Sequence, residues 1–147
     1  MKGYDWHKRI RGRKRHLLVD TQGWVLVAQV TGADRFDNQP LLPLVEAGVK
    51  RSSRLRHIWV DMGYRDGLAA LLARHHYHVT VEVVARPKAQ KGWQLLPRRW
   101  VVERTFAWLG RFRRMSKDYE YLTQTSEAMI YGVMSTLMLR RLARAAA

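Results

Sequence analysis

Two carboxylates in this sequence have neighbours that suit chemistry on a phosphodiester. Asp61 ends the apolar run of residues 57–60 and precedes a turn, Met62-Gly63-Tyr64, so it lies where α/β sheets expose ligand-binding groups. Glu103 lies in a predicted helix whose same face carries arginines and small residues. Mg²⁺ prefers carboxylate oxygens, and two such ions about 4 Å apart can activate the attacking oxygen and stabilise the leaving one. The pair predicts a metal-assisted site with Asp61 and Glu103 as its catalytic, metal-binding residues.

Glu103 also has a simpler interpretation. Arg99 lies four residues before it, and opposite charges at this spacing on a helix form ordinary surface ion pairs. Arginines beside a carboxylate can equally bind phosphate groups. Spacing alone leaves both interpretations open.

The sequence carries a large excess of positive charge. Its 27 Lys and Arg against 12 Asp and Glu give a formal charge of +15 over 147 residues. The cations are concentrated in residues 2–20 and 98–120. Because 47% of the residues are hydrophobic, the charge covers a folded body, and its expected partner is nucleic acid.

Other features exclude whole classes of protein. The absence of cysteine excludes disulfides, a thiolate nucleophile and zinc held by cysteines. The apolar segments are too short or too interrupted to cross a bilayer, and the N-terminus lacks the apolar region of a secretory signal. We therefore expect a cytoplasmic protein without a membrane partner.

Hydrophobic periodicity predicts one α/β layered domain over residues 1–147. A hairpin is expected around Gly23, a helix from Pro40 to Gly48, and a strand that ends at Asp61. The remaining predicted elements are the hairpin strands 16–19 and 24–30, a helix over 68–75, a strand over 78–85, and two C-terminal helices beginning near Arg98 and Ser126. Strands therefore alternate with helices until the final helical part.

Three motifs, in the same order along the chain, resemble those of one family. The run from Pro97 to Leu109, PRRWVVERTFAWL, resembles the segment bearing the catalytic glutamate in DDE transposases of bacterial insertion sequences, of the four/five type. The run from Gly12 to Thr21 resembles that family's hairpin opening, and Val60 to Tyr64 resembles the strand end holding its second aspartate. The resemblance covers nearly the whole chain.

The resemblance implies an RNase H-like layered domain with a mixed sheet. It also implies DNA cleavage and strand transfer that depend on Mg²⁺ or Mn²⁺, with Asp61 as the second carboxylate and Glu103 as the third. The implied partners are the terminal repeats of an insertion sequence and target DNA, with a homo-oligomer as an open possibility, and the implied location is the bacterial cytoplasm near the nucleoid.

The sequence departs from the family pattern in two places. The family signature has Tyr seven residues before the glutamate, Arg four before and Lys seven after, where this chain has Leu96, Arg99 and Gly110. The family's first aspartate lies on a strand before the hairpin, and neither Asp5 nor Asp20 fits that place. We therefore expect a truncated DDE transposase catalytic domain that lacks the first strand, with a gap beside the hairpin. The alternative is a non-catalytic basic DNA-binding domain, a transposase relict.

The expected DNA contacts come from the two basic segments. They are Arg13, Lys14 and Arg15 of the hairpin, with Arg99, Arg111 and Arg114 of the helical part. Arg111 or Arg114 is expected to replace the lysine that is missing from the family signature.

Overall fold

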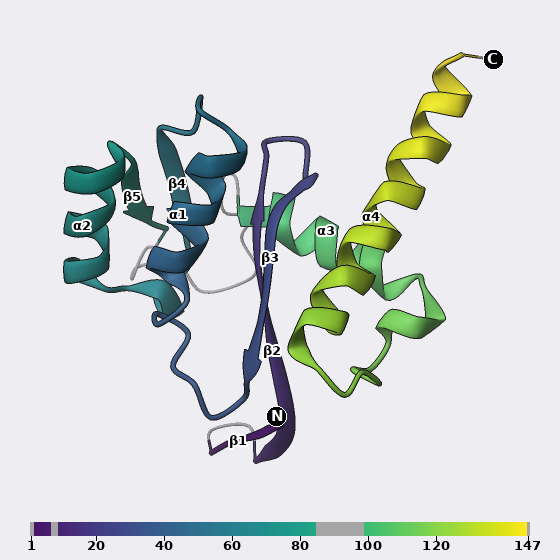
Figure 1. Ribbon diagram of the computed structural model, residues 1–147, viewed down its shortest axis with the longest axis horizontal. Coiled ribbons are helices and arrows are strands. Elements are labelled where there is room, and N and C mark those ends of the chain that lie inside the picture. The colour runs from purple at the N-terminus through teal and green to yellow at the C-terminus, as the bar shows by residue number, and fades with distance from the viewer. Residues whose placement is uncertain (1, 7–8, 85–98, 147) are drawn as a thin grey trace, which may run out of the picture.

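The computed structural model describes residues 2–6, 9–84 and 99–146, and Figure 1 shows their arrangement. The elements in chain order are β1 Gly3–Asp5, β2 Ile10–Val19, β3 Val25–Gly32, α1 Leu41–Arg51, β4 His57–Val60, the 3-10 turn η1 Met62–Tyr64, α2 Gly67–Tyr77, β5 Thr80–Val83, α3 Arg99–Gly110, the 3-10 turn η2 Arg113–Met115, and α4 Thr123–Ala145. Helices α1 and α2 lie on one side of the β2–β3 hairpin, and α3 and α4 lie on the other.

The hairpin β2–β3 is the longest paired structure in the described chain. The strands run antiparallel from Arg13 opposite Gly32 to Val19 opposite Val25. Gly23 adopts a φ of 86°, and the Asp20 carboxylate accepts hydrogen bonds from the backbone N–H of Gln22 and Trp24. The predicted hairpin and its glycine turn are therefore confirmed. The short β1, which the hydrophobic pattern does not reveal, pairs antiparallel with the start of β2.

The described strands form two sheets instead of the single mixed sheet that the sequence predicts. One sheet has the order β1-β2-β3, and the other consists of β4 and β5, paired in parallel. Within the described ranges, β2 and β4 are not hydrogen-bonded to each other. This break lies between the hairpin and the strand before Asp61, where the absence of a first strand predicts a gap.

Two hydrophobic clusters cover opposite faces of the hairpin, because successive residues of a strand point to opposite sides. Val27 packs in a cluster with Val45 of α1 and Ile58 of β4. Its neighbour Ala28 packs in the other cluster with Leu109 of α3 and Ile130 of α4. The hairpin therefore separates two cores.

Several predicted element boundaries are wrong. Helix α1 continues through Gly48 to Arg51. Gly48 is buried, and a Cβ there would lie 2.5 Å from Leu18 Cδ2, so the glycine serves close packing and does not end the helix. His78 is the left-handed C-cap of α2, with a φ of 54°, so β5 begins later than predicted. The last helix begins at Thr123, before Ser126.

The helix that carries Glu103 is shorter than its hydrophobic stripe suggests. It ends at Gly110, where the backbone N–H of Arg111 and Phe112 bond carbonyls only three residues back. Arg114 therefore lies in η2 and does not share a helix face with Glu103. The predicted start at Arg98 lies outside the described residues. No helix in the described ranges is long and apolar enough to cross a membrane.

Candidate active site

The pleat of β2 divides the basic run of residues 13–16 between the two sides of the hairpin. Arg13 and Arg15 hydrogen-bond to the segment that leads from η2 into α4. Lys14 and His16 contact the opposite side, towards the loop before α1 and the turn η1. Neighbouring basic residues therefore have different surroundings.

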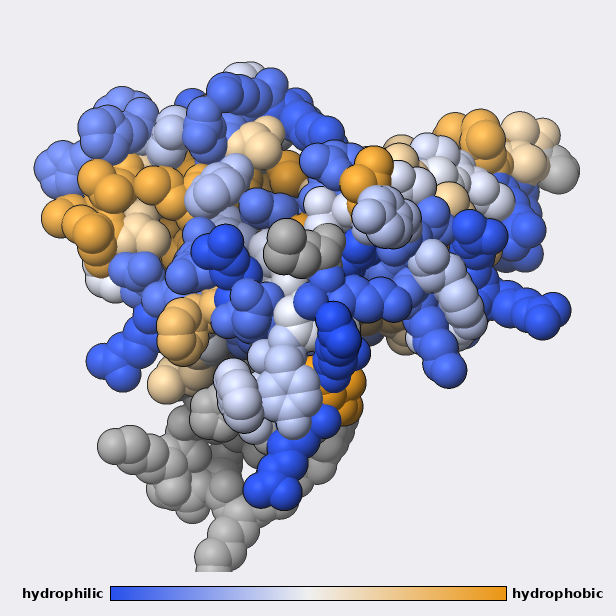
Figure 2. All heavy atoms as spheres, turned by 60° about the horizontal axis from the view of Figure 1, so that its bottom comes forward, coloured by the Kyte–Doolittle hydropathy of each residue, from blue (hydrophilic) through white to orange (hydrophobic). Residues whose placement is uncertain are grey.

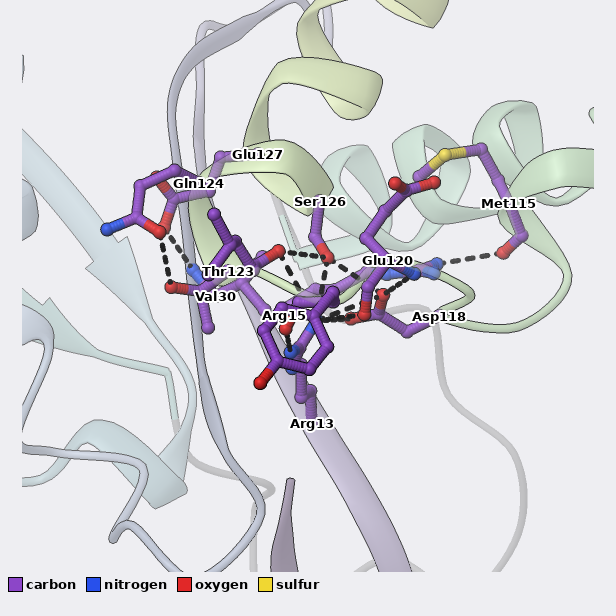
Figure 3. A network of polar contacts seen from close by, with 12 residues as sticks. Arg13, Arg15, Val30, Met115, Asp118, Glu120, Thr123, Gln124, Ser126 and Glu127 are labelled. Atoms are coloured by element: carbon purple, nitrogen blue, oxygen red, sulfur yellow. Dashed lines mark hydrogen bonds and ion pairs between the residues drawn. The ribbon is translucent and has the colours of Figure 1, made fainter. Parts of the chain in front are cut away.

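The Arg13 side chain is only 2% exposed and connects β2 to the start of α4 (Figure 3). Its guanidinium lies 3.2 Å from Asp118 Oδ2 and 3.1 Å from Ser126 Oγ. It also donates to three backbone carbonyls, those of Glu120, Tyr121 and Leu122. A planar guanidinium with five N–H groups suits this role, and the contacts leave Arg13 turned away from solvent.

Asp118 is held in its charged form by the same network. Partial burial raises the pKa of the Asp118 carboxyl, but hydrogen bonds from Ser126, from the backbone N–H of Glu120 and from Arg13 bring it below its ordinary value. Ser126 Oγ donates to Asp118 Oδ1 at 2.8 Å. The network therefore joins an ion pair to the first turn of α4.

The other side of β2 carries Lys14 and His16. Lys14 Nζ lies 2.9 Å from Asp37 Oδ1 and 3.9 Å from Asp5 Oδ2. His16 is buried, with Nδ1 2.6 Å from the Tyr64 hydroxyl and Nε2 2.9 Å from Thr31 Oγ1. Burial lowers the pKa of His16 to about 4; Asp37 raises this pKa and Lys14 lowers it. His16 is therefore neutral at pH 7.

Asp61 begins the turn that follows β4. Its Oδ1 accepts a hydrogen bond from the backbone N–H of Gly63 at 2.9 Å, and its side chain is exposed. A Cβ added at Gly63 would lie 3.2 Å from Asp61 Oδ1 and 3.1 Å from Asp37 Oδ2. The two carboxylates therefore flank the same glycine. Burial first, and then Asp61 and Asp37, raise the pKa of Tyr64 well above its ordinary value.

Glu103 is placed by contacts of α3 with the hairpin turn. Thr105 is fully buried, and its Oγ1 donates to the carbonyl of Gly23 at 2.7 Å. Arg104 Nη2 donates to the carbonyl of Gln22 at 2.7 Å, and its guanidinium lies over the Trp100 and Trp108 rings. These contacts hold α3 across the turn and leave Glu103 exposed on the helix.

A cavity of about 1920 Å³ joins the two predicted catalytic residues. Its lining includes residues 10–21 of β2 and its turn, β4 with Asp61, part of α3, and residues 116–118. Asp61 and Glu103 both belong to this lining, together with Asp5, Asp20, Asp37 and Asp118. The cavity thus extends from the break between the two sheets to the segment after η2, and carboxylates from separate elements line it.

The donor chemistry of these residues fits Mg²⁺ or Mn²⁺, which bind carboxylate oxygens and keep several waters. Asp61 Oδ1 already accepts from Gly63, so Oδ2 is the oxygen that would bind a cation. No group of three or more potential metal ligands exists among residues 2–6, 9–84 and 99–146. Asp61 and Glu103 therefore belong to no such group among the described residues.

The residues predicted to bind DNA fall into three groups. The Arg13 side chain is buried, Lys14 is paired with Asp37, and Arg15 donates to the Met115 carbonyl at 2.9 Å, so these three side chains have intramolecular roles. The structure describes the backbone of Arg99 but not its side chain. Arg111 is exposed, and Arg114 is exposed while it pairs with Glu120 at 2.8 Å.

Three residues of this region have no role that the sequence predicts. They are Asp37, His16 of the Gly12–Thr21 motif and Tyr64 of the Val60–Tyr64 motif. The alternation of β2 offered a signal, because Lys14 and His16 lie on the same side as Leu18. Nothing in the sequence indicated that Asp37 approaches Gly63.

Comparisons with known proteins agree with the sequence motifs. A family model described as a transposase DDE domain matches residues 1–138. A relative from Burkholderia cepacia, named "Putative transposase for insertion sequence element IS402", is 36% identical over 120 residues. The match covers 74% of this chain and 54% of the relative, so the chain spans about half the length of the protein it matches. No solved structure matches the chain.

Proposed function

The chain belongs to the family of DDE transposases, and from this premise we propose that it acts in DNA transposition through metal-dependent cleavage and strand transfer at insertion-sequence ends. The observation that carries this proposal is the cavity that Asp61 of β4 and Glu103 of α3 line together. These two side chains come from elements 42 residues apart in the sequence and line the same cavity.

In this proposal Asp61 and Glu103 hold Mg²⁺ or Mn²⁺. The bound cation would stabilise negative charge that develops on the phosphate oxygens. Asp61 contributes the carboxylate oxygen that Gly63 leaves unused, and Glu103 contributes a carboxylate from a helix clamped to the hairpin turn. Lys14 offsets the negative charge of Asp37 close to Asp61 and so limits the repulsion between the two carboxylates.

We also propose that the centre is completed by a third carboxylate on an extended segment. In an RNase H-like sheet such a strand pairs between β2 and β4, and within the described ranges residues 13–19 of β2 pair only with β3 and β4 pairs only with β5, so each leaves one edge without a backbone partner. An unpaired strand edge presents backbone N–H and C=O groups that another strand can satisfy. Asp61 and Glu103 alone are therefore expected to bind Mg²⁺ or Mn²⁺ weakly.

The proposed DNA-binding surface centres on exposed cations after α3. Arg111 and Arg114 of the predicted set lie in this segment, where Arg113 and Lys117 are also exposed. Hydrophilic side chains cover the middle of the face shown in Figure 2, with apolar patches at its two sides. Phosphate contacts depend on accessible charge, so these residues are better placed for DNA than the buried Arg13.

The test combines metal binding with DNA cleavage. Supercoiled DNA that carries the ends of the insertion sequence is incubated with the chain and Mg²⁺ or Mn²⁺, and weak Mn²⁺ binding without strand transfer is expected. Asp61→Asn and Glu103→Gln should each remove the Mn²⁺ binding, and Glu46→Gln, a surface acid of α1 paired with Lys50, should not. Robust cleavage by this chain alone, abolished by Asp61→Asn, would overturn the requirement for a third carboxylate.

The same samples distinguish a DNA-binding domain without catalysis. If the chain binds DNA while neither substitution changes Mn²⁺ binding, the catalytic assignment of Asp61 and Glu103 is wrong.

A further inference from the structure

A side-chain contact of the buried His16 spans the break between the two sheets. His16 lies on β2 and Tyr64 closes η1, the turn that follows β4. Their rings meet edge to face, with centroids 5.8 Å apart and planes at 90°. Since the backbones of β2 and β4 are not paired in the described chain, the hydrogen bond between His16 and Tyr64 supplies a directional link that the sheets lack.

The hydrogen bonds of His16 fix the orientation of its ring and of the Tyr64 ring. A neutral imidazole has one donor and one acceptor nitrogen, and His16 uses both on hydroxyl groups, those of Tyr64 and Thr31. A hydroxyl can act as donor or acceptor, so both nitrogens are satisfied in a buried position. Rotation of either ring would leave a buried polar group without its partner.

Tyr64 in turn belongs to the turn that carries Asp61. The backbone N–H of Tyr64 donates to the Asp61 carbonyl at 3.1 Å, and that of Gly63 donates to the Asp61 carboxylate. A three-residue 3-10 turn has few internal hydrogen bonds to define its position. The Tyr64 side chain therefore anchors the end of the turn against the hairpin.

The hairpin that carries His16 also holds the helix that carries Glu103. Thr105 and Arg104 of α3 donate to two carbonyls of the turn between β2 and β3. Asp61 and Glu103 share no secondary-structure element, but the turn after Asp61 and the helix that carries Glu103 both contact the same hairpin.

We propose that His16 and Tyr64 are positioning residues that set the Asp61 carboxylate relative to Glu103 across the cavity. This inference rests on the proposed function, because it assumes that Asp61 and Glu103 share a cation. Neither positioning residue touches the cation; His16 holds Tyr64, and Tyr64 holds the turn.

The experiment follows the backbone amides of the ¹⁵N-labelled chain by NMR during a titration with Mn²⁺, whose paramagnetism broadens nearby signals. In the wild-type chain, the amides of Gly63 and of α3 near Glu103 should broaden with the same midpoint. Tyr64→Phe retains the ring and removes the hydroxyl, and His16→Leu retains apolar bulk and removes both hydrogen bonds. Each should raise the Mn²⁺ midpoint at Gly63 about tenfold, the size typical of lost ligand-orienting contacts.

Two variants control for a purely structural effect. His16→Gln retains a donor and an acceptor and should stay close to the wild-type midpoint. Tyr131→Phe removes a hydroxyl that accepts the N–H of Ala28 on the other side of the same hairpin, and should leave the midpoint unchanged. Without metal, Tyr64→Phe should accelerate hydrogen exchange at Gly63 and leave α3 protected, whereas a general loss of stability would accelerate both.

The outcomes separate this inference from the proposed function. If Asp61→Asn removes the broadening at Gly63 while Tyr64→Phe and His16→Leu keep the wild-type midpoint, the positioning role is wrong and the metal-binding role stands. If Asp61→Asn leaves the broadening unchanged, or Mn²⁺ broadens neither set of amides, the metal-binding role fails and the positioning role with it.

Discussion

The basic residues of β2 alternate between its two faces, and the surroundings of the two faces differ. On the face towards α4, Arg13 is surrounded by acceptors and lies buried in a closed network. On the face towards α1, Lys14 pairs with Asp37, and His16 contacts the turn that carries Asp61. Residues of both faces line the cavity, Arg13 and Asp118 included, so the two sets of residues differ in their partners: one set joins β2 to α4, and the other lies beside the turn that carries Asp61.

Removal of Arg13 should have the largest effect on the closed face. Arg13→Met retains an unbranched side chain but leaves Asp118 without its cationic partner and removes the guanidinium donor of three carbonyls, so we expect a loss of about 3–5 kcal/mol in the free energy of unfolding by urea. Arg15→Met, which removes one hydrogen bond to the Met115 carbonyl, should cost about 1 kcal/mol. Equal losses for the two variants would mean that the closed network does not hold α4.

The face of β2 towards α1, which carries His16, should make the free energy of unfolding depend on pH in a separate pH range. The pKa of His16 is about 4 in the folded chain, below its ordinary value of 6.5, so between these values the unfolded chain binds more protons. Stability is therefore complete above pH 6.5 and falls towards pH 4, by up to about 3 kcal/mol. Urea unfolding at each pH measures this fall, and His16→Gln should flatten it.

The closed face should lose stability only at lower pH. The pKa of Asp118 is below its ordinary value of 3.8, so its contribution is present above pH 3.8 and is lost as the pH falls further. Below pH 3.8 the free energy of unfolding should fall in the same way for the wild type and for His16→Gln. Identical profiles for the two proteins between pH 4 and 6.5 would contradict the assignment to His16.

The hairpin turn belongs to both faces, and a substitution there should cause an intermediate loss in the free energy of unfolding. Gly23 has a φ of 86° and lies where a Cβ would be 2.8 Å from Thr105 Oγ1, so Gly23→Ala should cost about 1–2 kcal/mol from the backbone conformation alone. Thermal or urea unfolding measures the loss. Gly12→Ala, at a strand position with open space around its Cβ, is the matched control and should cost less.

The smallest effect concerns DNA affinity. Arg111→Gln removes an exposed cation, so the slope of log affinity against log salt should become shallower by about 0.9, the value for one phosphate contact. Lys14→Gln changes the net charge equally but removes a cation already paired with Asp37, so the slope should stay unchanged. Fluorescence anisotropy across a salt series measures both; equal slopes for the two variants would show that exposure does not select the DNA contacts.

The sequence predicts the order of elements well because periodicity reports which side of each element is buried. The hairpin around Gly23 follows from turn chemistry and apolar strands, and both are local properties. Gly48 misleads because it allows α1 to approach Leu18 and does not end the helix. The short β1 is invisible to periodicity because it pairs through backbone groups over only three residues.

The candidate site was predictable only in part. Asp61 and Glu103 follow from strand ends, helix spacing and motif resemblance, whereas the use of each cation depends on tertiary partners. Arg13 has the same charge as its neighbours, and its burial depends on acceptors more than 100 residues away. The approach of Asp37 to Asp61 also depends on how two loops fold together.

The Arg13 network also bears on the order in which the protein forms during its synthesis. The contact between Arg13 and Ser126 spans 113 residues, so at 5–20 residues per second the acceptors leave the ribosome roughly 5–25 s after the guanidinium. Throughout that interval the hairpin and α1 can assemble, but the acceptors that Asp118, Glu120 and Ser126 offer Arg13 have not yet been made. The emerging chain therefore passes through a stage in which one side of the hairpin is complete and the other exposes Ala28 and Val30, and synthesis of α4 covers them.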